Sequence, residues 1–247
     1  MQGTGAEFME KTKYPHLGPS SQQRGETQPP LQVSLGEGER TSLPAVEALS
    51  AKGIGLREAI EVRRSIRKYS ESALSTEDLS FLLWATQGVR ETLDTRATFR
   101  MVPSAGARHP FETVLLVNRV DGLDAGLYQY EALEHRLMQL PAPSDATEQL
   151  TAACHGQGMV TTSAVTFVWV ADIVRTTWRY GERGYRYIHL DAGHVCQNLY
   201  LAAEPVGAGV CAIAAFDDDD VNRLLRLDGS DRFAVYIAAV GKKQEAA

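Results

Sequence analysis

The feature that most constrains the fold is the apolar run AVTFVWVA at residues 164–171. Its β-branched and aromatic residues favour a strand. The run has no polar face, so a strand formed from it must be buried on both faces. A strand of this kind requires covering layers on either side. The sequence therefore predicts a central sheet flanked by helices.

Capping and periodic patterns predict the surrounding elements. Ser75 begins a helix whose buried stripe contains Leu79, Leu82 and Leu83, and Gly88 ends it. The strands do not alternate strictly with helices, which indicates an α+β protein with a mixed central sheet. The remaining expected helices lie near residues 56–63, 144–155, 187–203 and 218–225, and the remaining expected strands near 113–120, 127–130, 136–140, 210–214 and 233–240.

Residues 1–50 differ from the rest of the chain. They are rich in Gly, Pro, Ser and Gln and show no hydrophobic periodicity. Such a segment cannot bury enough apolar surface to fold alone. We expect an extended or flexible N-terminal arm over residues 1–50 and a folded domain over residues 51–247.

Charge and cysteine content exclude several classes of protein. A formal net charge of −6 gives no support for nucleic-acid binding or for an anionic membrane partner. The three cysteines, Cys154, Cys196 and Cys211, have no C-x-x-C spacing, which favours buried free thiols over a metal site or a disulfide framework. No apolar run has 18 residues and the N-terminus has no hydrophobic signal core, so we expect a soluble, cytoplasmic protein.

A basic segment, RRSIRKY at residues 63–69, follows the first expected core helix. Arginine offers a planar set of donors that suits a phosphate, and serine adds a hydroxyl donor. The same cations could instead complement the negative end of a helix. The residues alone leave both interpretations open.

A second segment, PSAGARHP at residues 103–110, consists largely of small residues bracketed by prolines. Small residues let the backbone approach a flat ligand closely. Taken alone, the segment is equally typical of a surface loop.

The two segments in this order resemble the nitroreductase family, and more narrowly its SagB-type dehydrogenase branch. The resemblance continues through RYGERGYRYIHLDAGHVCQNLYLAAE, VGAGVCAIAAFDDDD and VYIAAVGK and covers about residues 54–243. It implies a nitroreductase-like fold, a homodimer and an FMN cofactor. It also implies oxidoreductase activity, with NAD(P)H as a reductant and a small molecule or peptide as substrate.

The resemblance also implies roles for individual residues. It implies that the FMN phosphate is bound by Arg63, Arg64, Ser65 and Arg67, with Lys242 near it. The loop that lines the flavin ring, supplied by the other subunit, corresponds to Pro103, Ser104, Ala105 and Gly106. The stretch packed beside the ring corresponds to Ala212, Ile213, Ala214 and Ala215. Ala107 and His109 depart from the Asn and Gln that the family usually has in this loop.

A catalytic candidate comes from the same resemblance. Some SagB-type enzymes oxidise azoline rings in modified peptides with a Lys-Tyr pair, whose counterpart here is Arg179-Tyr180. Tyr180 could act as a general acid or base, or it could simply pack. Arginine stays protonated and cannot replace a lysine base, which counts against azoline oxidation.

No metal is expected, because the possible ligands His189 and His194 are five residues apart and point in different directions on a helix. The sequence favours an FMN-dependent oxidoreductase acting on a small organic substrate. Two alternatives stay open: a peptide-tailoring azoline dehydrogenase, and a flavin-binding sensor or assembly subunit without turnover.

Overall fold

The computed structural model describes residues 3–46 and 53–244. Seven strands form one sheet in the order β1-β6-β5-β4-β7-β9-β8, and β2 and β3 form a separate hairpin. The strands are β1 (Arg40–Ser42), β2 (Val89–Leu93), β3 (Ala97–Arg100), β4 (Phe111–Val117), β5 (Gly126–Glu131), β6 (Arg136–Leu140), β7 (Val165–Asp172), β8 (Ala208–Ile213) and β9 (Arg232–Lys242).

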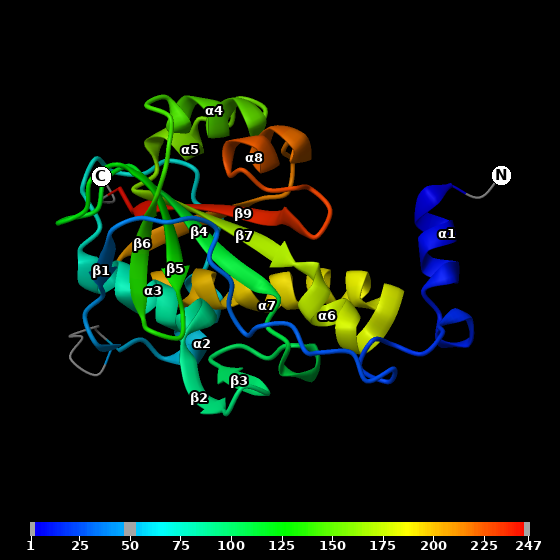
Figure 1. Cartoon of the computed structure of the whole chain (residues 1–247). Helices are drawn as coiled ribbons and strands as arrows, with labels where there is room; N and C mark the ends of the chain where they lie inside the picture. Colours follow the sequence, from blue (N-terminus) through cyan, green and yellow to red (C-terminus); the bar gives the residue numbers. More distant parts are fainter. Residues whose placement is uncertain (1–2, 47–52, 245–247) are drawn as a thin grey trace.

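The α-helices of the described chain are α1 (Thr4–Lys11), α2 (Leu56–Val62), α3 (Thr76–Gln87), α4 (Ala146–Ala153), α5 (Met159–Thr162), α6 (Ile173–Tyr180), α7 (Gly184–Ala203) and α8 (Asp218–Leu224). Single 3₁₀ turns lie at Tyr14–His16, Ala105–Ala107 and Gly181–Arg183. Figure 1 shows α3 and α7 on one face of the sheet and α4, α5 and α8 on the other.

The α+β class and the nitroreductase-like sheet with flanking helices are as predicted, but the sheet is not mixed. Every pairing between its named strands is antiparallel. The chain returns from β4 to β5 and from β5 to β6 through direct connections, which join antiparallel neighbours. The long helical crossover from β7 leads to β8, which pairs with β9 and not with β7. A parallel contact occurs as the isolated bridge between Ser65 and Val210.

The central strand β7 is buried at every position, as the apolar run predicted. Its side chains alternate between two cores. Phe167 and Trp169 join Leu79 and Leu199 on the α3–α7 face, whereas Val168 packs with the residues under α4 and α8. The sheet is therefore a middle layer with a separate apolar core on each side.

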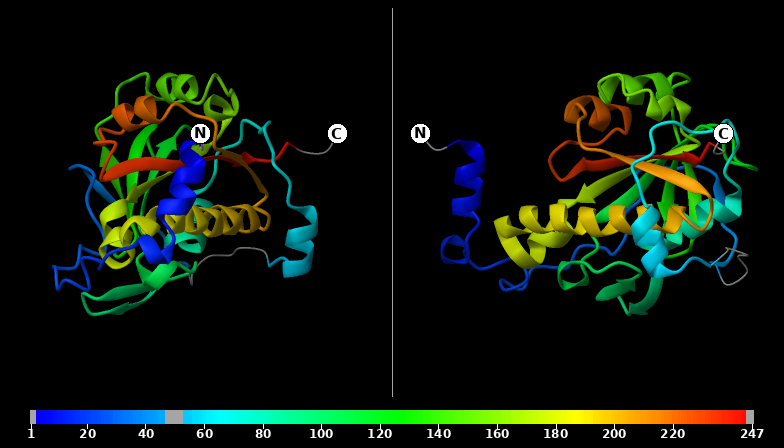
Figure 2. Two further views of the ribbon diagram at one scale, coloured as in Figure 1. Left: turned by 90° about the vertical axis from the view of Figure 1, so that its right-hand side faces the viewer. Right: turned by 180° about the vertical axis from the view of Figure 1, so that it is seen from behind.

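The N-terminal segment lies along the outside of this body. Helix α1 stands away from the sheet beyond the ends of α6 and α7 (Figures 1 and 2). Residues 20–35 then run back along the body, and β1 pairs with β6 at the edge of the sheet. Residues 40–42 of the expected arm are thus part of the sheet.

Candidate functional site

The basic segment begins where α2 ends at Val62. The chain becomes extended and lies against β8, and the amide of Ile66 donates to the carbonyl of Val210 at 2.9 Å. Gly209 permits this contact, because a Cβ there would lie 2.6 Å from the Cβ of Ile66. This close approach places the predicted phosphate-binding residues next to β8.

The three arginines of this segment carry charge that the described residues do not neutralise. Arg64 and Arg67 are exposed, and neither they nor Arg63 forms an ion pair with a carboxylate in residues 3–46 and 53–244. Many other arginines of the chain, such as Arg136 and Arg175, are paired with acids. A cluster of unpaired guanidinium groups on an acidic protein suits an anionic ligand.

Tyr200 of α7 joins this segment to β8. Its hydroxyl oxygen lies 3.0 Å from Oγ of Ser65 and accepts a hydrogen bond from the amide of Ala212 at 2.9 Å. The guanidinium of Arg63 lies 5.3 Å from the centre of its ring. The sequence analysis missed Tyr200, because nothing along the chain shows which residues it meets in the fold.

The segment Ala212–Ala215 leaves the sheet at this point. The last ladder pair of β8 joins Ile213 to Ile237, and Ala214 and Ala215 beyond it are exposed. No described residue accepts a hydrogen bond from their amides. The predicted phosphate segment and the predicted ring segment therefore come together around Tyr200, and the amides of Ala214 and Ala215 lie beyond the last ladder pair.

Lys242 is placed differently from the free arginines. Its ammonium group donates to Oδ2 of Asp78 at 2.7 Å and to the carbonyl of Val206 at 2.7 Å. Asp78 is thus an ion-pair partner at the start of α3, where Ser75 caps the helix by accepting from the Asp78 amide at 3.0 Å. A phosphate role for Lys242 stays a prediction that would require sharing this ammonium group.

The small-residue loop is anchored on the middle of α7. Ser104 donates to Oδ2 of Asp191 at 2.5 Å, and the amide of Ala105 lies 3.3 Å from both carboxylate oxygens. Burial raises the pKa of Asp191, while its bonds with Ser104 and Ala105 oppose that rise. The preceding Pro103 is exposed. One buried carboxylate thus holds the loop in place, with Ser104–Ala107 half-buried.

Gly106, which follows Ala105, brings this loop against the end of α6. Its φ is +58°, and a Cβ there would lie 2.5 Å from the Tyr180 hydroxyl and 2.9 Å from Cδ of Arg179. Glycine favours the left-handed conformation and lets the Tyr180 and Arg179 side chains approach the backbone this closely. The predicted loop and the predicted catalytic tyrosine are therefore neighbours within one chain.

His109, one of the two departures in this loop, is buried. Burial, together with the nearby Arg100 cation, lowers the pKa of His109 to about 3. Its imidazole is therefore neutral at physiological pH. The other departure, Ala107, has a φ of +53°.

The site residues form two groups along α7. One group surrounds Tyr200 and the other surrounds Asp191, nine positions earlier, which corresponds to about 14 Å at 1.5 Å per helical residue. Within one chain the structure brings Arg63, Ser65 and Ala212 together. It also brings Ser104–Gly106 together with Tyr180, but it does not join the two groups.

The other candidate residues are structural. All three cysteines are buried and free, as predicted, and burial raises the pKa of Cys154 to about 11 and of Cys196 to about 12. Within residues 3–46 and 53–244 no cluster of His, Cys, Asp and Glu could hold a metal ion. No helix in that part of the chain is long and apolar enough to cross a membrane.

Comparison with known proteins gives a consistent result. The nitroreductase family model matches residues 60–242. The Methanocaldococcus jannaschii protein MJ1384, a nitroreductase by name, is 32% identical over 211 residues, which are 85% of this chain and all of that protein.

Two further similarities involve longer proteins. The trifolitoxin-processing protein TfxB of Rhizobium leguminosarum bv. trifolii is 29% identical over 163 residues, 63% of this chain and 44% of TfxB. A crystal structure of an Anabaena variabilis protein, also a nitroreductase by name, is 29% identical and superposes with a TM-score of 0.67 over 84% of this chain and 42% of that one. The chain thus spans less than half of these two relatives. The family match over most of its length shows that this chain belongs to the nitroreductase family of oxidoreductases.

Proposed function

We propose that the protein is an FMN-dependent oxidoreductase that transfers hydride or electrons between NAD(P)H and a small organic substrate. The observation that carries this proposal is that Arg63, Arg64 and Arg67 have no ion-pair partner among the described residues and lie on a segment that Tyr200 joins to β8, which the exposed Ala214 and Ala215 follow. When bound, FMN supplies the redox chemistry, and the protein supplies binding, orientation and electrostatics.

The residues around Tyr200 fit the two ends of FMN. A terminal phosphate suits the arginines and the Ser65 hydroxyl, because charge-assisted hydrogen bonds to phosphate are strong. The amides of Ala214 and Ala215 could donate to the flavin ring, where they would favour its anionic reduced form. The small side chains of these two residues leave the backbone accessible.

The same proposal includes a homodimer with shared sites. Helix α2 exposes Leu56, Ile60 and Val62, which are 69%, 56% and 42% exposed, and α7 exposes Leu190 at 61%. Gly193, one turn further along α7, has no atom within 4 Å of the position its Cβ would take. Exposed apolar side chains next to both groups of site residues, Val62 beside Arg63 and Leu190 beside Asp191, support contact with a second copy. In such a dimer the Ser104–Gly106 loop would reach the partner's FMN.

The proposal is tested by measuring FMN binding to the purified protein. We expect a yellow protein with one FMN per chain, which NADH or NADPH reduces and a dye acceptor reoxidises. Arg63→Gln and Arg67→Gln should weaken FMN binding by about 10- to 150-fold, since a hydrogen bond to a charged group is worth about 1.5–3 kcal/mol.

The matched control is Arg223→Gln on α8, whose exposed guanidinium pairs with Asp220. It should bind FMN as the wild type does. Release of FAD, or absence of flavin after incubation with FMN, would contradict the proposal. Bound FMN that neither pyridine nucleotide reduces would instead identify a flavin-binding protein without turnover.

A second candidate function is peptide tailoring, which the similarity to the trifolitoxin-processing protein TfxB favours. In that case Tyr180 would act on a ring in a modified peptide. Arg179 precedes it and cannot act as a base. Oxidation of an azoline-containing peptide, followed by mass spectrometry as a loss of two hydrogens, distinguishes this candidate from the first.

A further inference from the structure

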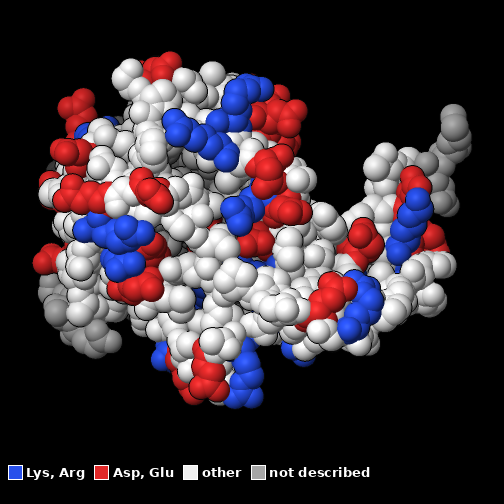
Figure 3. Space-filling view, in the orientation of Figure 1, with Lys and Arg blue, Asp and Glu red and all other residues white. Residues whose placement is uncertain are grey.

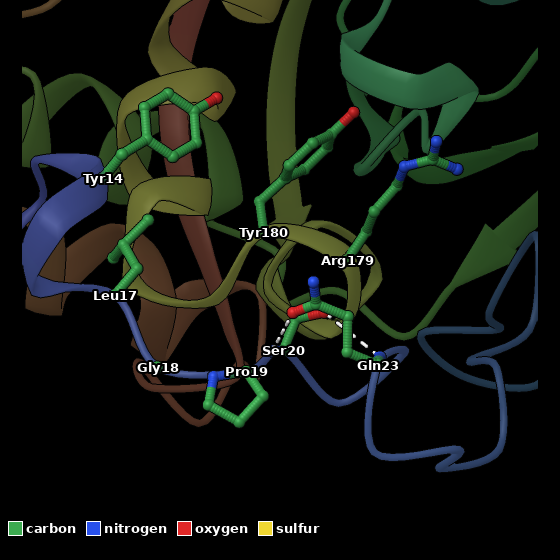
Figure 4. A pocket seen from close by; sticks show the side chains of 8 residues that line it. All are labelled: Tyr14, Leu17, Gly18, Pro19, Ser20, Gln23, Arg179 and Tyr180. Atoms are coloured by element: carbon green, nitrogen blue, oxygen red, sulfur yellow. Dashed lines mark hydrogen bonds between the residues drawn. The ribbon is translucent and has the colours of Figure 1, made fainter.

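The N-terminal segment forms one wall of an open cavity over the end of α6 that the proposed flavin site does not use. The cavity has a volume of about 480 Å³, within the range of small-molecule sites. It is lined by Tyr14, Leu17, Gly18, Pro19, Ser20, Gln23, Arg179 and Tyr180. Figure 4 shows the rings of Tyr14 and Tyr180 on either side, with Leu17 and Pro19 below and Arg179 beside Tyr180.

Specific contacts hold the wall formed by the N-terminal segment. The Gln22 amide donates to the carbonyl of Trp178 at 2.8 Å, and Nε1 of Trp178 donates to the carbonyl of Glu26 at 3.0 Å. The Tyr14 hydroxyl lies 2.9 Å from that of Tyr187. Arg183 covers the Tyr14 ring at 4.4 Å and donates to the carbonyl of Thr12. The wall is therefore tied to α6 and α7 on both sides of the cavity.

Ser20 and Gln23 of the lining bond to each other and Tyr14 bonds to Tyr187, which leaves Arg179 and Tyr180 as the polar groups available to a ligand. Arg179 is the charged member of the lining, and among the residues described its guanidinium has no hydrogen bond or ion pair, only the Tyr180 ring at 5.7 Å. The Tyr180 hydroxyl donates to none of these residues either. Arg183, by contrast, is occupied by Tyr187 and Thr12. A free cation beside a free hydroxyl suits a carboxylate, which can accept from both.

The rest of the lining suits an apolar body. Leu17, Pro19 and the two tyrosine rings provide flat and aliphatic surface, and aromatic rings pack well against such surfaces. The cavity also adjoins the proposed flavin loop, because Gly106 packs directly on Arg179 and Tyr180.

We propose that this cavity binds an aromatic carboxylate, with the carboxylate on Arg179 and Tyr180 and the ring between Tyr14 and Tyr180. Binding itself depends only on these side chains. Its role as the substrate pocket of the enzyme rests on the flavin-dependent function proposed above.

The test compares 2-naphthoate with the neutral 2-naphthamide by calorimetry on the full-length protein. Wild type should bind the carboxylate about 10-fold or more tightly than the amide, because a hydrogen bond to a charged group exceeds one to a neutral group. Arg179→Gln should remove this preference, because it weakens binding of the carboxylate by about 10-fold or more and weakens binding of the amide less. Tyr180→Phe should reduce the preference in part, and Arg223→Gln should keep it.

Equal binding of the two probes by the wild type, or an unchanged preference in Arg179→Gln, would overturn the proposal. The outcome is separable from that for the flavin. A carboxylate preference in protein that takes up no FMN would support the cavity and remove the flavin-dependent function. FMN binding without any carboxylate preference would support the flavin-dependent function and remove the proposed ligand of the cavity.

Discussion

At the scale of single residues, Asp191 organises the loop that the proposed flavin site depends on. It is 4% exposed and accepts from Ser104 and the Ala105 amide. Burial of a carboxylate disfavours its charged form, and the pKa of Asp191 lies above its ordinary value of 3.8. The residue thus gives the loop a fixed position at a cost in stability near neutral pH.

This cost predicts a pH dependence that Asp191→Asn removes. The native state binds the proton more tightly than the unfolded state, so the stability contribution is present below pH 3.8 and is lost as pH rises through the native pKa. Asparagine can still accept from Ser104. The free energy of unfolding of Asp191→Asn should therefore increase relative to that of wild type as pH rises above 3.8. The increase should be at most about 1.4 kcal/mol per pH unit.

Urea unfolding at a series of pH values measures this difference. Asp172, whose pKa burial also raises, is common to both proteins and cancels in the comparison. Asp191→Ala is the control, because it leaves Ser104 without its acceptor and should be less stable than Asp191→Asn. If the difference in free energy of unfolding between Asp191→Asn and wild type does not change with pH, Asp191 titrates alike in the native and unfolded states.

At the scale of elements, part of the N-terminal segment completes the polar interior of the body. The carbonyl of Leu31 accepts from the buried Arg175 at 2.9 Å. The amide of Val33 donates to Glu112 at 2.9 Å, and its carbonyl accepts from Gln129 at 2.6 Å. Glu112, Gln129 and Arg175 are all buried and also bond to one another, so removing these N-terminal backbone partners would take one further hydrogen bond from each of them.

Two truncations therefore have different effects. Removal of residues 1–27 takes away α1 and the cavity wall but keeps the backbone of Leu31 and Val33. Removal of residues 1–37 should destabilise the protein by a further amount of about 3 kcal/mol or more, since the lost hydrogen bonds to the charged Arg175 and Glu112 are worth about 1.5–3 kcal/mol each. Thermal unfolding followed by circular dichroism compares the two. Equal midpoints of thermal unfolding for the two truncated proteins would show that water replaces the backbone groups of Leu31 and Val33 as hydrogen-bond partners.

The elements that the sequence predicted are those whose signal lies in the local pattern. Strand β7 was visible because its run has no polar face. Helix α6 was missed because its buried residues include Arg175 and Thr176, which produce no apolar periodicity. Strand β1 was missed because all three residues are exposed. The antiparallel sheet and the Tyr200 contacts depend on pairing between distant segments, which local patterns do not contain.

At the scale of the whole molecule, the two groups of site residues do not meet within one chain, and the proposed homodimer would bring them together. The Arg63–Tyr200 group and the Ser104–Asp191 group share α7 but lie about 14 Å apart along it. Helices α2 and α7 both expose leucines, Leu56 and Leu190. A two-fold axis passing between the two groups would bring each group against the other group of the partner, because in a two-fold interface a residue i that contacts the partner's residue j requires j to contact the partner's i.

This arrangement predicts that two inactive variants restore activity when mixed. Arg63→Ala removes a cation from the proposed phosphate group, and Ala105→Trp obstructs the loop contributed to the partner's site. A heterodimer then contains one site with both changes and one with neither. With random subunit exchange, half of the dimers are mixed, so about a quarter of the sites are intact. Reductase activity of the mixture, with exchange verified by a mass tag, measures the recovery. Complete exchange without recovery, while both variants keep wild-type circular dichroism, would place each site within a single chain.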